Sequence, residues 1–398
     1  MENPKIRFKG YTKDWEQRKL GDVFKEYSEK NHTELSALTI IQGGGTVKRE
    51  DSDRNLMYDT SNLSNYKMVR KDDFIVHLRS FEGGLEKSSL DGIISPAYHT
   101  FHSDMADSRF YYPYFRSYEF IKHKLVSHVY GIRDGRSIDI DGMKTIEIPY
   151  TSIEEQRKIG DYLDCLDHLI TLHQRKCEQT KKLKKYMLQK MFPQNGAKVP
   201  EIRFDGFTYD WEQRKLKEIA DKVSEKNKNN EFSEPFTNSA EQGIISQKDY
   251  FDREIVNNEN LDSYYIVRND DFIYNPRISV TAPVGPINRN RLGRNGVMSP
   301  LYTVFRTHDI DNLYLEFYFK TTKWHRFMKL NGDSGARFDR FTISSTQFME
   351  MPIPYPMLDE QRKMGEYFDS LDHLITLHQR KCDELKKMKK YMLQNMFI

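Results

Sequence analysis

Arginine is concentrated in one stretch of the chain that holds no acidic residue. From Phe272 to His308 there is no Asp or Glu, and five arginines lie among Asn and Gly residues: Arg277, Arg289, Arg291, Arg294 and Arg306. Attraction to phosphate needs basic loops of this kind, and the arginine fork also donates bidentate hydrogen bonds to guanine in the major groove. The stretch therefore indicates nucleic-acid binding, with a basic surface loop that has no partner as the alternative.

Comparable basic positions recur in similar places in both halves of the chain. The first half has an acid-free run from Lys122 to Arg133, and the second half has a basic cluster from Lys323 to Lys329. Each is followed by a Gly- and Arg-containing segment that is predicted to form a loop tip. Any one of these arginines is equally suited to a structural ion pair, so the prediction of nucleic-acid binding rests on their recurrence in both halves. The candidate DNA-binding residues are Arg79, Lys122, Lys124, Arg133, Arg136, Arg277, Arg289, Arg291, Arg294, Lys323, Arg326, Arg337 and Arg340.

No catalytic or metal-binding motif accompanies these residues. The segment GGGTVK at Gly43–Lys48 lacks the spacing of a phosphate-binding loop, and NPRI at Asn275–Ile278 lacks the second proline and the aromatic residue of the adenine methyltransferase signature. The histidines have no carboxylate or cysteine at a ligand spacing, and Cys177 and Cys382 fall on an apolar helical stripe. We therefore expect that the chain is not an enzyme and holds no metal.

The bulk composition fits a folded protein with more than one domain. The chain has 398 residues, and 37% of them are hydrophobic, which suffices for about two or three cores. The formal charge of +3 excludes a histone-like polycation, so basic character has to be local. Three cysteines without a Cys-x-x-Cys pair, no signal peptide and no apolar run of membrane-spanning length predict a cytoplasmic protein.

The chain consists of two copies of one plan, which must position the basic segments. The segment LDHLITLHQRKC occurs at 166–177 and again at 371–382, and the surrounding blocks 154–192 and 359–397 are identical at 29 of 39 positions. A second block, IRFKGYTKDWEQRKL from residue 6, returns as IRFDGFTYDWEQRKL from residue 202. The segments between these blocks share only scattered anchors, such as VRKDDFI and VRNDDFI. The two halves should therefore have one fold and two different surfaces.

The block that closes each half predicts a long helix. A coiled-coil rhythm of apolar residues starts at Ile159, and Leu183 and the methionines that follow it extend the stripe. Ser152 and Glu155 form a candidate capping box, whereas the second copy has Met357 in place of the serine. A helix of roughly 36 residues would be about 54 Å long.

The charges of these helices predict how they pair. Residues 154–167 hold five acidic and two basic side chains, whereas residues 175–190 hold one acidic and seven basic ones, and the second copy has the same asymmetry. Parallel packing would bring like charges together, but antiparallel packing opposes each acidic start to a basic end. We therefore expect an antiparallel pair. The segments before the helices, in which β-rich runs and turn residues alternate with Tyr-rich helical stretches, predict α+β domains.

This arrangement resembles the specificity subunit of Type I restriction-modification systems. The resemblance rests on IEIPYTSIEEQRKIGDYLDCLDHLITLHQRKC and MEMPIPYPMLDEQRKMGEYFDSLDHLITLHQRKC, in which a proline segment and Glu-Gln lead into a long helix, and the shared layout extends over nearly the whole chain. It implies an α+β fold class, with two α/β target-recognition domains separated by two long antiparallel coiled-coil helices and a pseudo-two-fold internal repeat.

The resemblance also implies domain boundaries and roles. Each target-recognition domain would read one half of a bipartite, asymmetric DNA site, and the helices would serve as a spacer on which two methyltransferase subunits dock. The implied boundaries are target-recognition domain 1 at 1–150, spacer helix 1 at 151–192, a linker at 193–200, target-recognition domain 2 at 201–356 and spacer helix 2 at 357–398. The candidate docking and spacer residues on the helices are Gln156, Leu163, Leu166, Ile170, Gln361, Leu371 and Ile375.

The partners implied by the resemblance are double-stranded DNA, two methyltransferase (modification) subunits and restriction/translocase subunits, with no membrane. S-adenosylmethionine would bind to the methyltransferase partner, and ATP and Mg to the restriction partner, with no cofactor bound by this chain. Three other interpretations stay open. They are a target-recognition subunit of a related multi-subunit restriction or methylation system, a coiled-coil scaffold that binds only proteins, and an enzyme with its own active site, against which the missing motifs argue.

Overall fold

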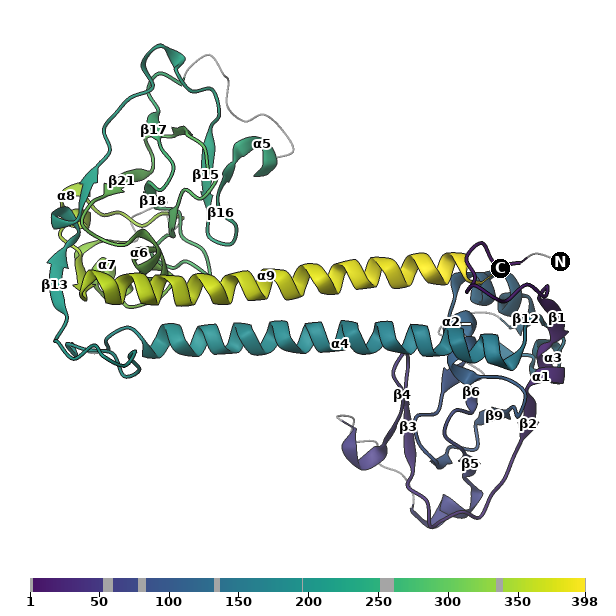
Figure 1. Ribbon diagram of the computed structural model, residues 1–398. Helices are drawn as coiled ribbons and strands as arrows, with labels where there is room; N and C mark the ends of the chain where they lie inside the picture. The colour runs from purple at the N-terminus through teal and green to yellow at the C-terminus, as the bar shows by residue number, and fades with distance from the viewer. Residues whose placement is uncertain are drawn as a thin grey trace. The chain divides into compact units, whose positions relative to one another are not determined.

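The computed structural model describes residues 3–52, 60–77, 84–131, 137–194, 196–250, 261–333 and 339–397. The chain forms two compact units (Figure 1). The first unit consists of residues 1–174 and 379–398, and the second consists of residues 175–378. Each unit therefore combines one α+β portion with a part of each long helix, and the predicted α+β fold is confirmed.

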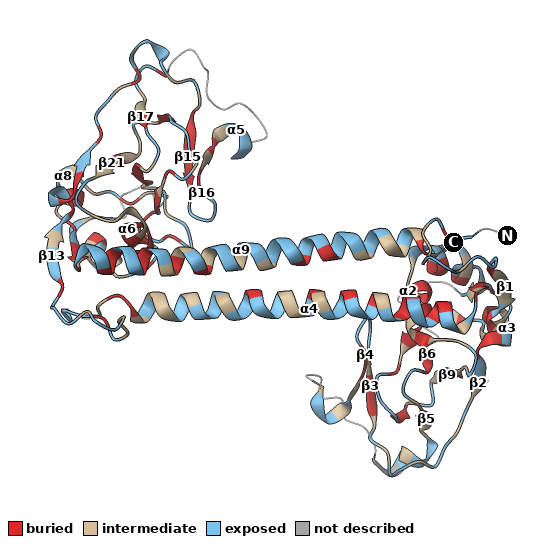
Figure 2. Cartoon of the chain, viewed as in Figure 1, coloured by how far each residue is buried: buried red, intermediate tan, exposed pale blue. Residues whose placement is uncertain are grey.

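The two long helices are α4 (Ile153–Lys190) and α9 (Leu358–Asn395), each of 38 residues and so about 57 Å long. In the first unit, Leu163 of α4 shares a core with Met396, whereas Ile170, two turns further along α4, clusters with Cys382. Residue numbers thus rise along α4 as they fall along α9. Figure 2 shows the buried positions recurring at intervals along both helices. The predicted antiparallel pairing is confirmed.

Ion pairs join the acidic start of one helix to the basic end of the other in both units. In the first unit, Nζ of Lys389 donates to Oδ2 of Asp167 at 2.6 Å. In the second unit, Nζ of Lys184 donates to Oδ2 of Asp372, also at 2.6 Å. These two contacts are the same pair in the repeat, and they agree with the charge asymmetry of the sequence.

The predicted apolar stripe is wrong at Leu183, which is 45% exposed. Lys184 takes the inward position instead, with its ammonium group on Asp372 and 5.0 Å from the ring centre of Phe317. The alternating steps of four and three residues that begin at Ile159 lead from Thr180 to residue 184, so the inner position belongs to Lys184. Leu183 lies one position before it, and it fits the stripe by residue type but not by register.

The repeated block near residues 6–20 and 202–216 anchors the start of each long helix. Glu155 on α4 accepts two hydrogen bonds from the guanidinium of Arg7, at 2.6 and 2.8 Å, and one from Nε1 of Trp15 at 3.2 Å. Glu360 on α9 accepts the same set from Arg203 and Trp211. The Ser152 hydroxyl caps α4 by accepting from the Glu155 N–H at 3.3 Å, but the Glu155 carboxylate turns to Arg7, so the capping box is half formed.

A four-stranded antiparallel sheet forms the centre of each α+β portion. Its order is β2-β9-β6-β7 in the first unit and β14-β21-β18-β19 in the second. The register is shared, since Phe74 lies opposite Phe101 and Phe272 lies opposite Phe305. Helix α2 or α6 packs its aromatic side chains against this sheet.

The first unit contains strands β1 (Glu16–Lys19), β2 (Lys25–Tyr27), β3 (Leu38–Ile41), β4 (Gly45–Lys48), β5 (Lys67–Val69), β6 (Phe74–His77), β7 (Glu86–Lys87), β8 (Gly92–Ile94), β9 (Tyr98–His102), β10 (Val129–Tyr130), β11 (Ser137–Ile138) and β12 (Glu147–Tyr150), and helices α1 (Leu20–Val23), α2 (Ser108–Phe115) and α3 (Ile140–Lys144). The second contains β13 (Glu212–Lys215), β14 (Ala220–Lys222), β15 (Phe236–Ser239), β16 (Gly243–Ser246), β17 (Tyr265–Val267), β18 (Phe272–Tyr274), β19 (Ile287–Arg289), β20 (Gly296–Met298), β21 (Thr303–Thr307) and β22 (Pro352–Tyr355), and helices α5 (Gln247–Tyr250), α6 (Asn312–Phe319), α7 (His325–Asn331) and α8 (Ser345–Met349).

Candidate nucleic-acid interface

Two arginines of the acid-free stretch converge on one carboxylate. The Nε atoms of Arg289 and Arg291 both lie 2.8 Å from Oε2 of Glu316 on α6. Arg289 also contacts Asp270, and Arg291 reaches Asp369 on α9, each at 2.8 Å. The Arg289 side chain is only 11% exposed. Both arginines therefore tie the sheet to the helices of the second unit.

Two more arginines of this stretch are held by carboxylates from other segments. Arg294 makes two hydrogen bonds of 2.8 Å with Glu234 and thereby lowers the pKa of that carboxyl group. Arg306 makes two hydrogen bonds with the buried Asp271, at 2.8 and 2.9 Å. The stretch is free of acids in sequence, but in the fold these side chains are neutralised by acids that lie elsewhere in the chain.

Arg277 differs from these four arginines. It lies in the connection between β18 and β19, its side chain is exposed, and it forms no ion pair with any residue that the structure describes. Arg340 lies beside it, because the two residues form an isolated β-bridge. Nε of Arg340 is 3.9 Å from its neighbour Asp339, which is a loose contact. This connection thus presents the guanidinium of Arg277 without a carboxylate partner among the described residues.

The other candidate side chains are spread over both units. Lys122 is exposed on a short π-helix, whereas Lys124 is partly buried and donates to the backbone oxygen of Glu147 at 2.7 Å. Arg326 is exposed on α7. Arg79, Arg133, Arg136 and Arg337 lie outside the described residues.

Lys323 lines a basic groove of about 450 Å³ in the second unit. Its other charged walls are Lys181, Lys184, Lys185 and Lys320, with Asp372 as the only acid among the lining residues that the structure describes. Burial lowers the pKa of Lys320 and of Lys323. Sequence reasoning singled out Lys323 but did not bring it together with the lysines of α4.

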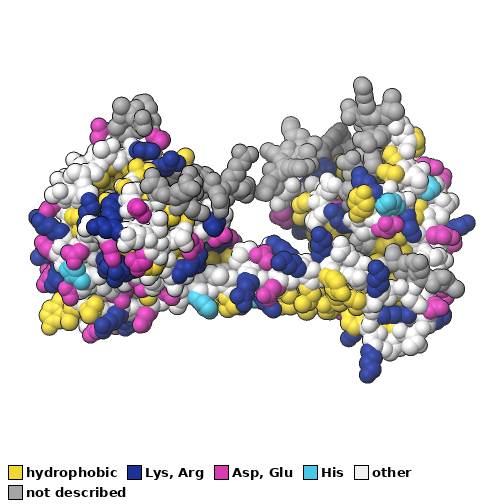
Figure 3. Space-filling view, turned by 90° about the horizontal axis from the view of Figure 1, so that it is seen from above, with side chains coloured by type: hydrophobic (Ala, Val, Ile, Leu, Met, Phe, Trp, Pro, Cys, Tyr) yellow, Lys and Arg dark blue, Asp and Glu magenta, His cyan; other side chains and the backbone are white. Residues whose placement is uncertain are grey.

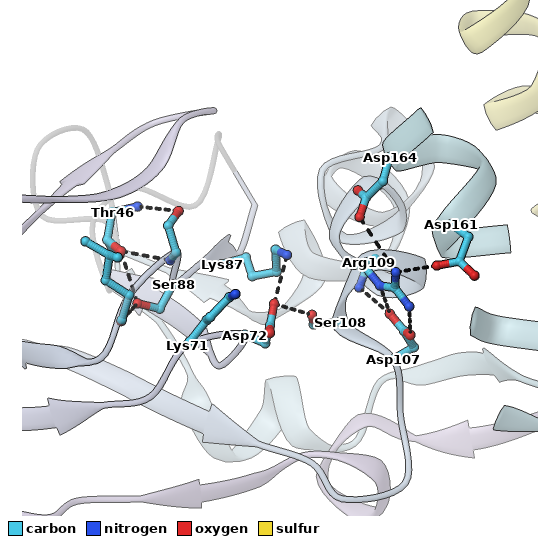
Figure 4. A network of polar contacts seen from close by, with 12 residues as sticks. Thr46, Lys71, Asp72, Lys87, Ser88, Asp107, Ser108, Arg109, Asp161 and Asp164 are labelled. Carbon is cyan, nitrogen blue, oxygen red and sulfur yellow. Dashed lines mark hydrogen bonds and ion pairs between the residues drawn. The ribbon is translucent and has the colours of Figure 1, made fainter. Parts of the chain in front are cut away.

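The first unit contains a polar cleft of about 510 Å³ that was not predicted (Figure 4). Asp72 holds Lys87 at 3.0 Å and accepts from the Ser108 hydroxyl at 3.1 Å. Arg109 at the start of α2 binds Asp107 at 2.7 Å and also contacts Asp161 on α4. The repeated segments VRKDDFI and VRNDDFI could have indicated this cleft. Their paired aspartates are Asp72 and Asp73 in the first unit, and both line the cleft.

The buried second aspartate of each anchor has a different cation in each unit. Nδ1 of His102 lies 2.5 Å from Oδ1 of Asp73, whereas Arg306 binds Asp271 at the equivalent register position. The Asp73 carboxylate accepts this hydrogen bond and so raises the pKa of His102 above its ordinary value. One unit thus uses a titratable cation where the other uses a permanent one.

The candidate helix residues lie mainly on buried sides. Gln156 and Gln361 are fully buried, and each amide oxygen accepts at 2.9 Å from the N–H of the aspartate that caps α2 or α6. Leu163, Leu166, Ile170 and Leu371 are buried in the cores, while Ile375 is partly exposed. These residues fix the helices to the α+β portions and to each other.

An apolar set that is at least partly exposed recurs on the helix pair of each unit. In the first unit it consists of the exposed Met388 and Tyr391 on α9 and the half-buried Leu169 and Leu172 on α4. The repeat places Leu374 and Leu377 on α9 with Leu183 and Tyr186 on α4 in the second unit, where the four are 40–50% exposed. Two residues that are three positions apart on one helix lie on the same side of that helix, next to its buried positions. Because the two helices are antiparallel, the apolar residues of α4 and those of α9 lie on the same side of the helix pair. We call these sets the first and second apolar faces.

Hydrophobic side chains are visible along the helical part of the surface in Figure 3. Within the described ranges, no group of three or more His, Cys, Asp or Glu side chains is arranged to hold a metal ion. No described helix combines the length and the apolar character that crossing a membrane requires.

Comparison with protein families gives two matches to one model along the chain. Residues 12–182 and residues 209–387 each match the family described as Type I restriction modification DNA specificity domain. Each match includes most of one α+β portion and most of the long helix that follows it.

Two relatives from Methanocaldococcus jannaschii are similar to part of this chain. The Type I restriction enzyme MjaVIII specificity subunit is 26% identical over 273 residues, which are 64% of this chain and 62% of the relative. The putative Type I restriction enzyme MjaX specificity subunit is 26% identical over 275 residues, 65% of this chain and 60% of the relative. The alignment thus spans less than two thirds of either relative.

A solved structure has the same fold. The S subunit of a Type I restriction-modification system from M. genitalium aligns with a TM-score of 0.55 at 17% identity, covering 100% of this chain and 99% of that one. The similarity extends to both α+β portions and both long helices.

Proposed function

Because the chain belongs to the family of Type I restriction modification DNA specificity domains, we propose that it is the non-catalytic DNA-recognition subunit of a Type I restriction-modification complex. The observation that carries the proposal is the double family match, which coincides with a doubled structure. A protein that reads one continuous site needs one such domain, whereas two domains with different surfaces suit a bipartite, asymmetric site.

Each α+β portion would read one half of that site. The two sheets have the same strand order, but the side chains they present differ, as His102 against Arg306 illustrates. For direct contact with DNA we favour the exposed residues Arg277, Lys122 and Arg326. Arg289, Arg291 and Arg294 would act by holding the loops in place, because their guanidinium groups are already bonded to carboxylates.

The first and second apolar faces would each dock one methyltransferase subunit. Exposed and half-buried Leu, Met and Tyr side chains that cluster on one side of a helix pair fit an apolar protein surface, and tyrosine is enriched where protein interfaces are strongest. The faces repeat because the partner is present twice. S-adenosylmethionine would bind to the methyltransferase partner, and ATP and Mg to a restriction partner.

The long helices would also set the gap between the two half-sites. They have the length and the uninterrupted helical sequence of a spacer, and each gives one part to either unit. The number of base pairs in the gap would then depend on the number of residues in the helices.

A genome-wide map of methylated adenines tests DNA recognition directly. The chain is expressed in a host beside its methyltransferase subunit, and the map is compared with that of the same host without the chain. We expect one split motif that disappears with the gene, and the map gives both half-sites and the gap. An unchanged methylation pattern would refute the proposed function.

Single substitutions on the apolar faces test the docking of the partner. Tyr186→Glu and Tyr391→Glu place a charge on the second and first face, and each should lower the number of bound methyltransferase subunits from two to one. The double variant should bind none. Tyr209→Glu is the matched control, because Tyr209 is 71% exposed and lies outside the helices. Stoichiometry measured by light scattering distinguishes these outcomes, and full assembly of the double variant would exclude this surface.

A further inference from the structure

The connection between β18 and β19 ends in a rigid turn. The backbone N–H and C=O groups of Ser279 and Ala282 bond to each other, at 3.0 and 3.2 Å, so that residues 279–282 form a tight turn. The Ser279 hydroxyl accepts a further hydrogen bond from the Ala282 N–H at 3.1 Å. Val280 and Thr281 are the two central residues of this turn.

Both feet of the connection are anchored to the domain. The Asn275 N–H donates to the backbone oxygen of Pro286 at 3.0 Å, and the Tyr274 hydroxyl donates to that of Val284. The Ile278 N–H donates to the backbone oxygen of Asp339 at 3.1 Å. The turn is therefore held in one position before any ligand arrives, which lowers the entropic cost of using it for recognition.

Val280 points entirely into solvent. Its relative exposure is 101%, whereas Ala282 and Val284 in the same connection are buried. Single exposed aliphatic residues are common on protein surfaces. Here, however, the side chain sits at the tip of an anchored turn, with the exposed Arg277 at its base and Arg340 bridged to Arg277. An apolar tip with two arginines at its base is suited to a surface that carries both phosphates and an apolar group.

Thymine supplies such an apolar group, because its C5-methyl is the one methyl that the four standard bases display in the major groove. Resting on the proposed function, we propose that Val280 is a specificity-determining residue that contacts the C5-methyl of a thymine in the half-site read by the second unit. Arg277 reaches the backbone or base edge beside it. The neighbouring Ser279 and Thr281 hydroxyls, 3.2 Å apart, hold each other at the same tip.

Uracil substitution tests this contact, because it removes the methyl group and leaves base pairing intact. The full chain with its methyltransferase subunits is titrated with duplexes in which each thymine of the methylated motif is replaced in turn by uracil. With the unmodified chain, one position of one half-site should lose about fourfold in affinity, which corresponds to burial of one methyl group at about 0.8 kcal/mol. With Val280→Ala, the thymine duplex should bind about as weakly as the uracil duplex.

Leu330→Ala is the matched control, since Leu330 is 74% exposed on α7 of the same unit. It should keep the full difference between thymine and uracil. If sequence-specific binding is intact but no position is sensitive to uracil, or if Val280→Ala keeps the sensitivity, the role of Val280 is refuted and the proposed function stands. If the complex shows no sequence-specific binding to any duplex, the proposed function itself fails.

Discussion

Replacing Arg7 with methionine should destabilise the first unit by about 3 kcal/mol at neutral pH. Glu155 is 1% exposed and Arg7 is 14% exposed, so the substitution leaves a buried carboxylate without its cation. Breaking such a pair costs about 3 to 5 kcal/mol, and the lower end applies because Trp15 and Thr151 still donate to the carboxylate. For a domain of this size the midpoint of thermal unfolding should fall by roughly 6 to 12 °C.

The deficit should shrink in acid. Burial alone would raise the pKa of Glu155, but the hydrogen bonds from Arg7 and Thr151 outweigh it and hold the pKa below its ordinary value. A group with a lowered folded-state pKa stabilises the fold above its unfolded-state pKa of about 4.3, and this stability is lost as the pH falls through the folded-state value. Unmodified and variant proteins should therefore become more similar below about pH 4.

Thermal unfolding followed by tryptophan fluorescence, in neutral and acidic buffers, measures both effects. Arg203→Met removes the equivalent cation from Glu360 and should cause a comparable loss in the second unit. Arg362→Met is the control, because the pair of Arg362 with Asp359 is exposed to solvent, and the midpoint should not move. An Arg7→Met protein with an unchanged midpoint at neutral pH, or with the same deficit in acid, would refute the reasoning.

Inserting seven residues into each long helix keeps the coiled-coil repeat and adds about 10 Å, so the gap in the methylated motif should widen by up to about three base pairs. Continued methylation of the original motif would contradict the spacer role. Replacing His102 with arginine should remove a pH dependence of the stability of the first unit. Because the pKa of His102 is raised in the folded state, its pairing with Asp73 stabilises the fold fully below about pH 6.5. This stability is lost as the pH rises through the higher folded-state pKa. Unfolding midpoints at mildly acidic and alkaline pH should differ for histidine and not for arginine. Replacing Gln156 with leucine should cost about 1 to 3 kcal/mol, because the buried backbone oxygen of Thr151 and the part-buried N–H of Asp107 lose their partner. Gln361→Leu should give the same loss, and an unchanged urea midpoint for either variant would count against this role.

The long helices could be predicted because they depend on local and periodic signals. Ser152 caps α4 as its residue type suggests, and the charge asymmetry of the repeats gives the antiparallel pairing seen in the contact of Lys389 with Asp167. The prediction is wrong at Leu183, because the rhythm of four and three residues continues from Thr180 to Lys184, which takes the inner position although its residue type is charged. Register along a helix therefore predicts the inner position better than residue type does.

The state of the individual arginines could not be predicted, because ion pairs depend on residues that are distant in sequence. Arg291 binds Asp369, which is 78 positions away in the sequence, and Arg294 binds Glu234, which is 60 positions away. A stretch of sequence without acidic residues therefore does not predict either contact. Arg277 has the same residue type and the same neighbourhood in sequence, yet it forms no ion pair with any described residue. Only the fold separates the arginines that are bonded to carboxylates from those that are not.

Cys177 and Cys382 occupy the same position in the two repeats, and each is 2% exposed. Cys382 is covered by the helix pair of the first unit, and the Cys177 thiol donates to the backbone oxygen of Ile375 at 3.8 Å in the second unit. A thiol reagent can reach either sulfur only when the helices of that unit part, whereas Cys165 is exposed in the folded chain. The rates of labelling relative to Cys165 would therefore report the local opening free energy of each helix pair separately, without any introduced probe.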